Sequence, residues 1–189
     1  GIVAAGGNLS PGMLLSAYEQ GIFPWYSEGE PILWHSPEPR FVLFPRQFRL
    51  PRSVRRVLRR APYEVSFDGD FPRIIGGCKE VIRPGQEGTW ITDEMEAAYI
   101  KLHELGYAHS VEVWRRKGGE LVGGLYGVSL GRIFCGESMF SLESDASKVG
   151  FVALARTLFH LEFELIDSQV YTEHLARFGA EEIARERYL

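Results

Sequence analysis

The sequence predicts an α+β protein in which a small N-terminal domain, residues 1–62, precedes a mixed-sheet domain, residues 63–189, with helices on both faces of the sheet. Three observations predict this class. The 189 residues are 45% hydrophobic and 24% charged, which is typical of a soluble globular protein. Residues 1–62 are rich in Pro and Gly, which leaves room only for short strands, turns and short helices. From residue 63 onward, strand-like and helix-like polarity patterns alternate.

Two helices are expected in the N-terminal domain. Ser10 and Pro11 form a typical helix start and Gly21 a typical end, so the first helix is expected from residue 11 to about residue 20. The second is expected from Pro51 to about residue 60, where Pro62 follows. Its arginines recur at helical spacing on one face, and its apolar residues fall mainly on the other.

The elements of the second domain follow from alternation and from helix-end signals. Thr92 is a typical N-cap, and Gly106 and Gly179 are typical helix ends. Strands are expected over residues 63–67, 108–116, 120–129, 132–139 and 164–169, with a hairpin turn at 117–120. Helices are expected over residues 71–78, 93–105, 147–159 and 173–178.

Basic residues are concentrated in one segment of an otherwise acidic chain. The net charge is −4, yet eight arginines and no acidic residue lie between Arg40 and Arg60. The rest of the chain has 13 basic and 25 acidic residues. This distribution favours one local site for a polyanion over a general coat for nucleic acid.

The sequence argues against several common classes of protein. It has no apolar run of the roughly 20 residues that a membrane helix needs, and its first residues do not resemble a signal peptide. Two cysteines form no disulfide framework, so we expect a reducing cytosol. No P-loop, GxGxxG or GxSxG motif is present, and no His, Cys and carboxylate spacing suggests a metal site.

Four short segments are unusual for a structural core. Two place Trp25 and Trp90 in turns flanked by glycine, at residues 21–25 and 88–92. A third, residues 134–140, sets Glu137 among aromatic and sulfur-containing side chains. The fourth ends an apolar strand with Asp167 and Gln169, which we expect on one face because they are two residues apart. Structural roles remain open at this point: core tryptophans, a carboxylate bonded to a loop amide, polar strand ends, and a solvated arginine face.

The order of the predicted elements resembles that of GNAT-type acyltransferases, although their pyrophosphate loop, Arg/Gln-x-x-Gly-x-Gly/Ala, is absent. The unusual segments together, in this order, resemble the bacterial leucyl/phenylalanyl-tRNA–protein transferase family. The matching stretches cover most of the chain: residues 6–11, 18–25, 31–34, 36–37, 87–92, 102–106, 109–114, 121–128, 134–141, 146–148 and 165–169. The resemblance implies a two-domain fold with a GNAT-like C-terminal domain.

The resemblance also implies an activity. Members move Leu or Phe, and Met less well, from aminoacyl-tRNA to the N-terminal Arg or Lys of an acceptor protein, which marks it for degradation by the N-end rule. It implies that Asp167 and Gln169 are the catalytic pair. Asp167 is expected to be the orienting carboxylate, and Gln169 to hold the acceptor's amine by its amide oxygen. No cofactor is needed, because the donor ester is already activated.

The resemblance assigns the other candidate residues to substrate binding. Trp25 and Trp90 are expected to stack on the terminal adenine, and Glu137 to bond the aminoacyl amine or the adenosine. The apolar side-chain pocket is expected to include Val128, Phe134, Met139 and Leu154. Phosphates of tRNA are expected on the basic helix and the residues just before it: Arg49, Arg52, Arg55, Arg56, Arg59 and Arg60.

Two alternatives from other classes remain in the sequence. One is a GNAT-type N-acetyltransferase that uses acetyl-CoA, which the missing pyrophosphate loop disfavours. The other is a non-catalytic RNA-binding module, which would account for the basic helix but would leave Asp167, Gln169 and the two tryptophan turns without a role. For the preferred interpretation we expect a cytoplasmic monomer with no membrane partner.

Overall fold

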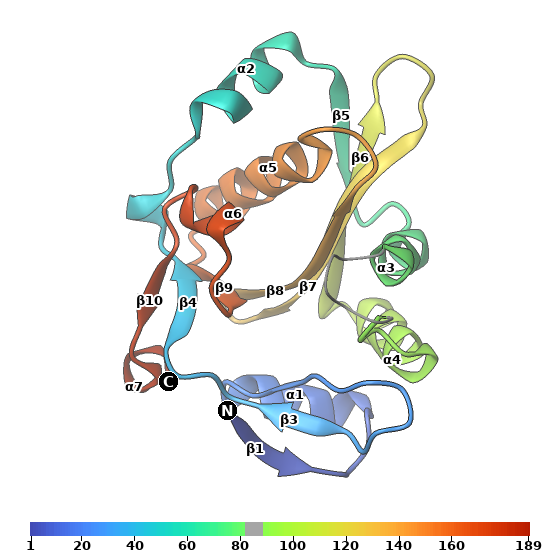
Figure 1. Cartoon of the computed structure of the whole chain (residues 1–189), viewed down its shortest axis with the longest axis vertical. Coiled ribbons are helices and arrows are strands. Elements are labelled where there is room, and N and C mark those ends of the chain that lie inside the picture. The colour runs from blue at the N-terminus through green and yellow to red at the C-terminus, as the bar shows by residue number, and fades with distance from the viewer. Residues whose placement is uncertain (82–88) are drawn as a thin grey trace.

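The computed structural model describes residues 1–81 and 89–189, and these residues form two sheets of unequal size (Figure 1). The smaller sheet has the order β1–β3–β2, with all of its pairs antiparallel. Its strands are β1 (Ile2–Ala5), β2 (Phe23–Pro24) and β3 (Leu33–His35), and helix α1 (Pro11–Glu19) lies between β1 and β2 in the chain. Ser10 caps α1, because its side chain accepts the backbone N–H of Met13.

The larger sheet has the order β10–β4–β9–β8–β7–β6–β5. Its neighbours are antiparallel except for β8 and β9, which run parallel. The strands are β4 (Arg40–Leu43), β5 (Tyr63–Phe67), β6 (Ala108–Arg115), β7 (Leu121–Leu130), β8 (Ile133–Ser141), β9 (Leu165–Gln169) and β10 (Glu181–Ile183). Because β4 pairs with both β9 and β10, the larger sheet begins upstream of residue 62, where the sequence predicts the domain boundary.

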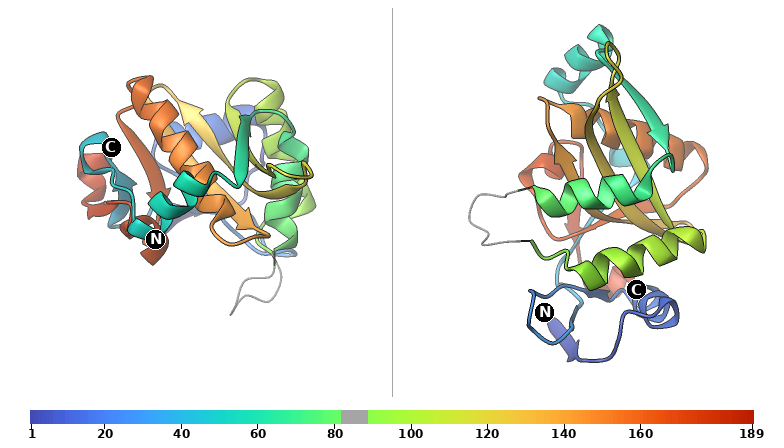
Figure 2. Two further views of the ribbon diagram at one scale, coloured as in Figure 1. Left: turned by 90° about the horizontal axis from the view of Figure 1, so that it is seen from above. Right: turned by 90° about the vertical axis from the view of Figure 1, so that its right-hand side faces the viewer.

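Helices cover both faces of the larger sheet, as the sequence predicts (Figures 1 and 2). Helices α3 (Phe71–Glu80) and α4 (Asp93–Glu104) pack on one face, and α5 (Ala146–His160) packs on the other. Helix α2 (Arg52–Arg60) lies against α5 through the buried Val54. Three short helices complete the described residues: the 3₁₀ helix η1 (Pro45–Gln47), α6 (Glu173–Ala176) and α7 (Arg185–Tyr188).

Two apolar cores, one on each face of the larger sheet, hold the elements in place. One core joins α1, β2 and β3 of the N-terminal unit to α3, α4 and the sheet. The other joins α5, α2 and α6 to the opposite face. The N-terminal unit is therefore packed against the face that carries α3 and α4, and within the described residues no helix is long and apolar enough to cross a membrane.

Every helix and strand that the sequence predicts by residue range is present, with ends shifted by at most a few residues. Among the described residues, the structure adds seven elements, each four residues long or shorter: β1, β2, β3, β4, η1, β10 and α7. Strands this short carry too few residues to display a period of two. Their pairing partners are also far away in the sequence, so local pattern does not reveal them.

Candidate active site

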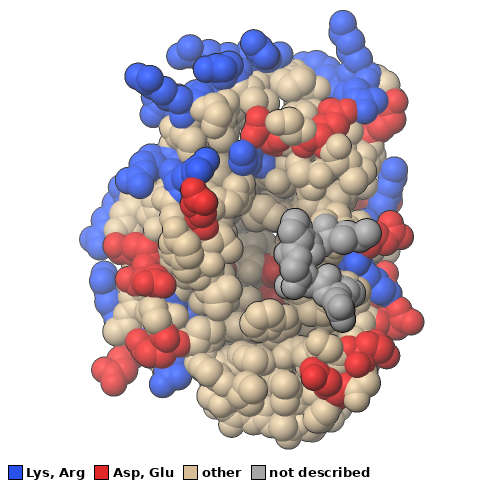
Figure 3. Space-filling view, in the orientation of Figure 1, with Lys and Arg blue, Asp and Glu red and all other residues tan. Residues whose placement is uncertain are grey.

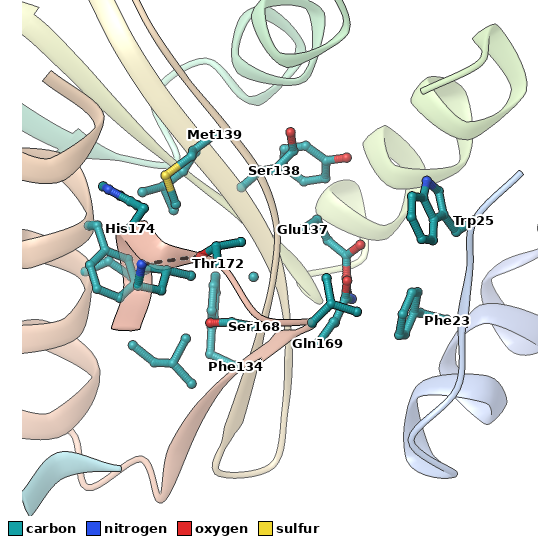
Figure 4. Close-up of a pocket in the computed structure, with 18 of the residues that line it drawn as sticks. Phe23, Trp25, Phe134, Glu137, Ser138, Met139, Ser168, Gln169, Thr172 and His174 are labelled. Atoms are coloured by element: carbon teal, nitrogen blue, oxygen red, sulfur yellow. Dashed lines mark hydrogen bonds between the residues drawn. The ribbon is translucent and has the colours of Figure 1, made fainter. Parts of the chain in front are cut away.

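A cavity of about 490 Å³ opens where the two parallel strands of the larger sheet separate (Figure 4). Strands β8 and β9 pair only from Ile133 and Leu165 to Cys135 and Asp167. Beyond that point β8 stays paired with β7 and β9 stays paired with β4, so a gap opens between β8 and β9. The cavity is lined by Phe23, Pro24, Trp25, Trp90, Leu125, Tyr126, Phe134, Gly136, Glu137, Ser138, Met139, Phe151, Leu154, Ile166, Ser168, Gln169, Val170, Thr172, His174 and Leu175.

Glu137 reaches this cavity because it is the extra residue of a β-bulge. On β7, Tyr126 pairs with Ser138 and Gly127 pairs with Gly136, so Glu137 has no partner in the ladder. A bulge bends its strand and re-aims the unpaired side chain, and bulges are frequent beside active sites. The sequence analysis expects an unbroken strand over residues 132–139, so local pattern does not reveal this bulge.

The Glu137 carboxyl accepts two side-chain hydrogen bonds through one oxygen. Its Oε1 accepts hydrogen bonds from Tyr18 Oη at 2.6 Å and from Gln169 Nε2 at 3.0 Å. Burial, the largest influence, raises the pKa of Glu137 to about 8, against the lowering effect of the Tyr18 hydrogen bond. Near neutral pH Glu137 is therefore largely protonated, and it is a hydrogen-bonding group whose charge changes just above neutrality.

Two buried tyrosines connect this carboxyl to helices α1 and α4. Tyr18 belongs to α1 and Tyr99 to α4, and their hydroxyl oxygens lie 2.5 Å apart. Burial raises the pKa of both phenols, and the nearby Glu137 raises it further. Both therefore stay neutral, and the N-terminal unit contributes a hydroxyl directly to the site that the larger sheet forms.

Gln169 enters the cavity because the backbone turns at the end of β9. Its φ is +65°, in the left-handed region that side chains other than glycine rarely adopt, at a typical cost of about 1–2 kcal/mol. The backbone N–H of Gln169 donates to Asp167 Oδ1 at 2.9 Å, and this bond supports the turn. The side chain then extends to Glu137.

The prediction that Asp167 and Gln169 lie on one face of the strand is wrong. Ile166 and Ser168 line the cavity, and Gln169 joins them only through its left-handed turn. Asp167 is fully buried and does not line the cavity. Regular alternation places the Asp167 side chain on the face of β9 away from the cavity. The prediction from the two-residue spacing fails because Gln169 leaves regular strand geometry.

Behind β9, Asp167 is paired with Arg40, which the sequence analysis counted only as the first member of the basic segment. Arg40 Nε and Nη2 donate to Asp167 Oδ1 and Oδ2 at 2.9 and 2.6 Å. Tyr188 Oη also donates to Oδ2, at 3.0 Å. This bidentate pair satisfies a carboxylate that would otherwise be very costly to bury.

The apolar part of the cavity contains three of the four predicted wall residues. Phe134, Met139 and Leu154 line it, and Figure 4 shows Met139 and Phe134 on the side opposite Trp25. Val128 does not, because it lies on the other face of β7 in the core with α3 and α4. The structure adds apolar wall residues that the sequence analysis missed, among them Leu125, Phe151, Ile166 and Leu175.

The two predicted tryptophans lie at the cavity, each on a different part of the chain. Trp25 follows β2 of the N-terminal unit and is 42% exposed, so its ring is available to a ligand. The His35 ring lies 5.6 Å from the Trp25 ring, and its Nε2 is 2.8 Å from the Trp25 carbonyl oxygen. Trp90 precedes α4, although Gly88 of its predicted turn lies outside the described residues.

The predicted basic surface lies apart from the cavity. Figure 3 shows lysine and arginine side chains gathered over α2, above the hollow that holds the site. Val54 is buried against α5, and the arginines of α2 are exposed, as the helical spacing predicts. Within the described ranges none of the six predicted residues forms an ion pair: Arg49, Arg52, Arg55, Arg56, Arg59 and Arg60.

The parallel strands of a mixed sheet separate around an apolar chamber that ends at an amide and a carboxyl, an arrangement suited to an enzyme that transfers a group with an apolar side chain. The chain belongs to one family of transferases, the leucyl/phenylalanyl-tRNA protein transferases. The family's sequence model, Leucyl/phenylalanyl-tRNA protein transferase, matches residues 42–189, and the model of its N-terminal domain matches residues 7–38. The break between these two matches falls where the two sheets divide, between β3 and β4.

Individual relatives agree with the family models. The leucyl/phenylalanyl-tRNA–protein transferase of Myxococcus xanthus is 61% identical over 189 residues, which is 100% of this chain and 80% of that protein. The protein of the same name from Syntrophus aciditrophicus is 60% identical over 188 residues, or 100% of this chain and 78% of that protein. Among solved structures, L-PGS from Bacillus licheniformis is a distant likeness, with 11% identity and a TM-score of 0.49 over 84% of this chain and 51% of that chain.

Proposed function

We propose that the protein transfers Leu or Phe, and Met less well, from aminoacyl-tRNA to the N-terminal Arg or Lys of acceptor proteins, which marks them for degradation. The observation that carries this proposal is the cavity itself, in which an apolar chamber ends at the hydrogen-bonded Glu137 and Gln169. The chamber takes the amino-acid side chain. The polar end takes the amine and the ester.

The chamber supports a preference for side chains that are not branched at Cβ. Phe134, Met139 and Leu154 offer apolar contacts to the outer atoms of Leu or Phe. A branch at Cβ, as in Ile or Val, would place a methyl group at the narrow polar end beside Glu137 and Gln169. Apolar pockets of this kind discriminate one methyl group by about 1–3 kcal/mol.

In the proposed reaction the acceptor's α-amine attacks the ester carbonyl of the donor. An amide bond forms, the ester bond to the terminal ribose breaks, and the ribose oxygen leaves with a proton. The Gln169 amide nitrogen, Nε2, donates to Glu137. The Gln169 amide oxygen can then accept a hydrogen bond from the attacking amine. Because the donor ester is already activated, positioning of the two reactants can supply several kcal/mol of the barrier reduction, and no cofactor is required.

The proposed donor binds at two places. Its terminal adenine stacks on Trp25 and Trp90 at the cavity, and its acceptor stem lies along the arginines of α2. The separation between the exposed arginines and the cavity supports this division, since a phosphate backbone can reach both while a free amino acid cannot. We further propose that the protein acts in the cytoplasm as a monomer without a membrane partner, and sedimentation of the purified protein tests the monomer.

The decisive experiment is an aminoacyl-transfer assay with purified protein, Leu-tRNA or Phe-tRNA, and a peptide that starts with Arg. We expect the labelled amino acid to appear on the peptide, and a matched peptide that starts with Gly to stay unlabelled. Ile-tRNA is the matched control for the donor. Absence of transfer from every donor, together with a thermal shift in the presence of acetyl-CoA, would instead favour an acetyltransferase.

A further inference from the structure

Arg40 is the most deeply buried cation among the described residues, and it contacts both units of the protein. Its side chain is 1% exposed, and its guanidinium binds Asp167 of β9 through two parallel hydrogen bonds. Its remaining terminal nitrogen, Nη1, donates to the carbonyl oxygen of Gly21 at 2.7 Å. The guanidinium carbon also lies over two rings, 5.2 Å from the centre of Phe23 and 4.4 Å from that of Tyr188.

One of these contacts leads directly into the cavity. Arg40 Nε donates to Asp167 Oδ1, and the same oxygen accepts the backbone N–H of Gln169. That N–H belongs to the left-handed residue whose side chain binds Glu137. The position of the Asp167 carboxylate therefore sets the backbone of Gln169, and Arg40 sets the position of the carboxylate.

The guanidinium is the group that suits this arrangement. A carboxylate that receives two parallel hydrogen bonds from an arginine is fixed in both position and plane. A lysine ammonium keeps the charge, but it is a single point that cannot bond both Asp167 oxygens and Gly21 with the same geometry. Arg40→Lys therefore removes the paired hydrogen bonds to Asp167 and keeps the positive charge.

We propose that Arg40 is a positioning residue for the transfer reaction, acting through Asp167 on Gln169. Arg40 is not itself a lining residue of the cavity, although its guanidinium lies over the ring of Phe23, which is. This inference rests on the proposed function. It adds a residue from the basic segment to the site, at a place where that residue cannot meet tRNA.

The contact with Gly21 gives Arg40 a second, separable effect. Gly21 immediately precedes β2 and the segment that carries Phe23 and Trp25 to the cavity. Loss of this contact is expected to loosen the proposed adenine-binding side and to weaken donor binding. The rate of transfer from bound donor depends on Gln169, whereas donor affinity depends on Trp25, so the two effects appear in different measurements.

The test is a double-mutant cycle of wild type, Arg40→Lys, Gln169→Ala and the double variant, measured by single-turnover transfer at saturating Leu-tRNA. We expect Arg40→Lys to lower the rate constant by about 10- to 100-fold, the loss that a displacement of about 1 Å can cause. In the Gln169→Ala background the same substitution is expected to change the rate constant by less than about threefold, because Gln169 carries the effect.

Single-turnover data also separate misplacement from misfolding. A folding defect lowers the amplitude, which counts active molecules, while a misplaced Gln169 lowers the rate constant at full amplitude. Arg115→Lys is the matched control, because Arg115 lies at the end of β6, outside the cavity lining, and is paired with Glu143. This variant is expected to keep the wild-type rate constant.

Each outcome bears on the proposal. Equal rate losses from Arg40→Lys in both backgrounds, or a loss of amplitude with an unchanged rate constant, would overturn it. A wild-type protein without transfer activity would instead remove the proposed function on which the inference rests. A rate loss in the wild-type background that disappears in Gln169→Ala supports both.

Discussion

Arg40 and the arginines of α2 come from one acid-free stretch of sequence, yet they occupy opposite environments. Arg40 is buried against Asp167 and Gly21, whereas the arginines of α2 are exposed and form no ion pair within the described residues. In the sequence they belong to one basic segment, residues 40–60. Burial and partners divide them into a single internal cation paired with Asp167 and an exposed basic surface that we propose binds a polyanion.

The largest expected effect is on the buried member of this comparison. Arg40→Met removes the charge and leaves Asp167 unpaired, which is expected to lower the free energy of unfolding by about 3–5 kcal/mol. Arg56→Met on the surface of α2 is expected to change it by less than about 0.5 kcal/mol. Urea denaturation of both variants checks this, and similar losses would erase the distinction between the two environments.

The second effect falls on the exposed members. Reversal of Arg52, Arg56 and Arg59 to Glu is expected to weaken tRNA binding by roughly 100-fold at moderate salt and to reduce the slope of log affinity against log salt by about 3. Binding titrations at several salt concentrations measure both quantities.

The melting temperature of this triple variant should stay near that of wild type, because the three arginines are exposed. Transfer from a short aminoacyl-adenosine donor should also survive. Unchanged tRNA affinity at low and moderate salt would contradict the assignment, and Arg132→Glu, in the turn between β7 and β8, serves as a control for charge reversal alone.

A smaller effect is expected at the proposed adenine-binding side. Trp25→Ala or Trp90→Ala removes a stacking surface, so the affinity for a minimal aminoacyl-adenosine donor is expected to fall by about 1–3 kcal/mol. Trp114→Ala is the matched control, because Trp114 lies on β6, outside the cavity lining. If only full-length tRNA binds less well, the two tryptophans do not contact the terminal base.

The last effect concerns the charge at the site and appears in the pH dependence of stability. The pKa of Glu137 is about 8 in the folded protein and 4.5 in its ordinary state, so between these values the folded state binds more protons than the unfolded state. The contribution of Glu137 is therefore complete below pH 4.5 and is lost as the pH rises through 8.

Glu137→Gln keeps the neutral, hydrogen-bonding form at every pH. We expect its free energy of unfolding to fall less steeply than that of wild type between pH 5 and pH 8, as measured by urea denaturation at several pH values. Glu164→Gln, at an exposed position, should leave the slope unchanged. Parallel slopes for wild type and Glu137→Gln would show that Glu137 ionises normally.

Much of the fold could be predicted from local pattern, because most of its helices and strands are long enough to show a period and a capping signal. Helix α4, with Thr92 at its start and Gly106 after its end, is an example. Strand β4 was not predictable in this way. Its four residues become a strand only by pairing with β9, more than 120 residues later, and that pairing is not encoded locally.

The candidate site was predictable in residue type but not in geometry. Glu137 and Gln169 stand out in the sequence as polar residues in apolar surroundings, and the structure joins them by a hydrogen bond. Two backbone departures bring them together, a bulge at Glu137 and a left-handed turn at Gln169, and neither leaves a periodic signal. The buried position of Arg40 was not predictable even in residue type, because nothing in its local sequence separates it from the surface arginines that follow.

The hydrogen bonds that complete the site join residues very far apart along the chain, and this bears on how the protein folds. Tyr18 and Glu137 are separated by 119 positions, and Arg40 and Asp167 by 127. Contacts of such long range form slowly, because closing a long loop costs entropy before the contact can stabilise anything. During refolding the helices are therefore expected to recover first and transfer activity last, so a partly folded chain could display its exposed arginines to tRNA while it still lacks the means to use the amino acid.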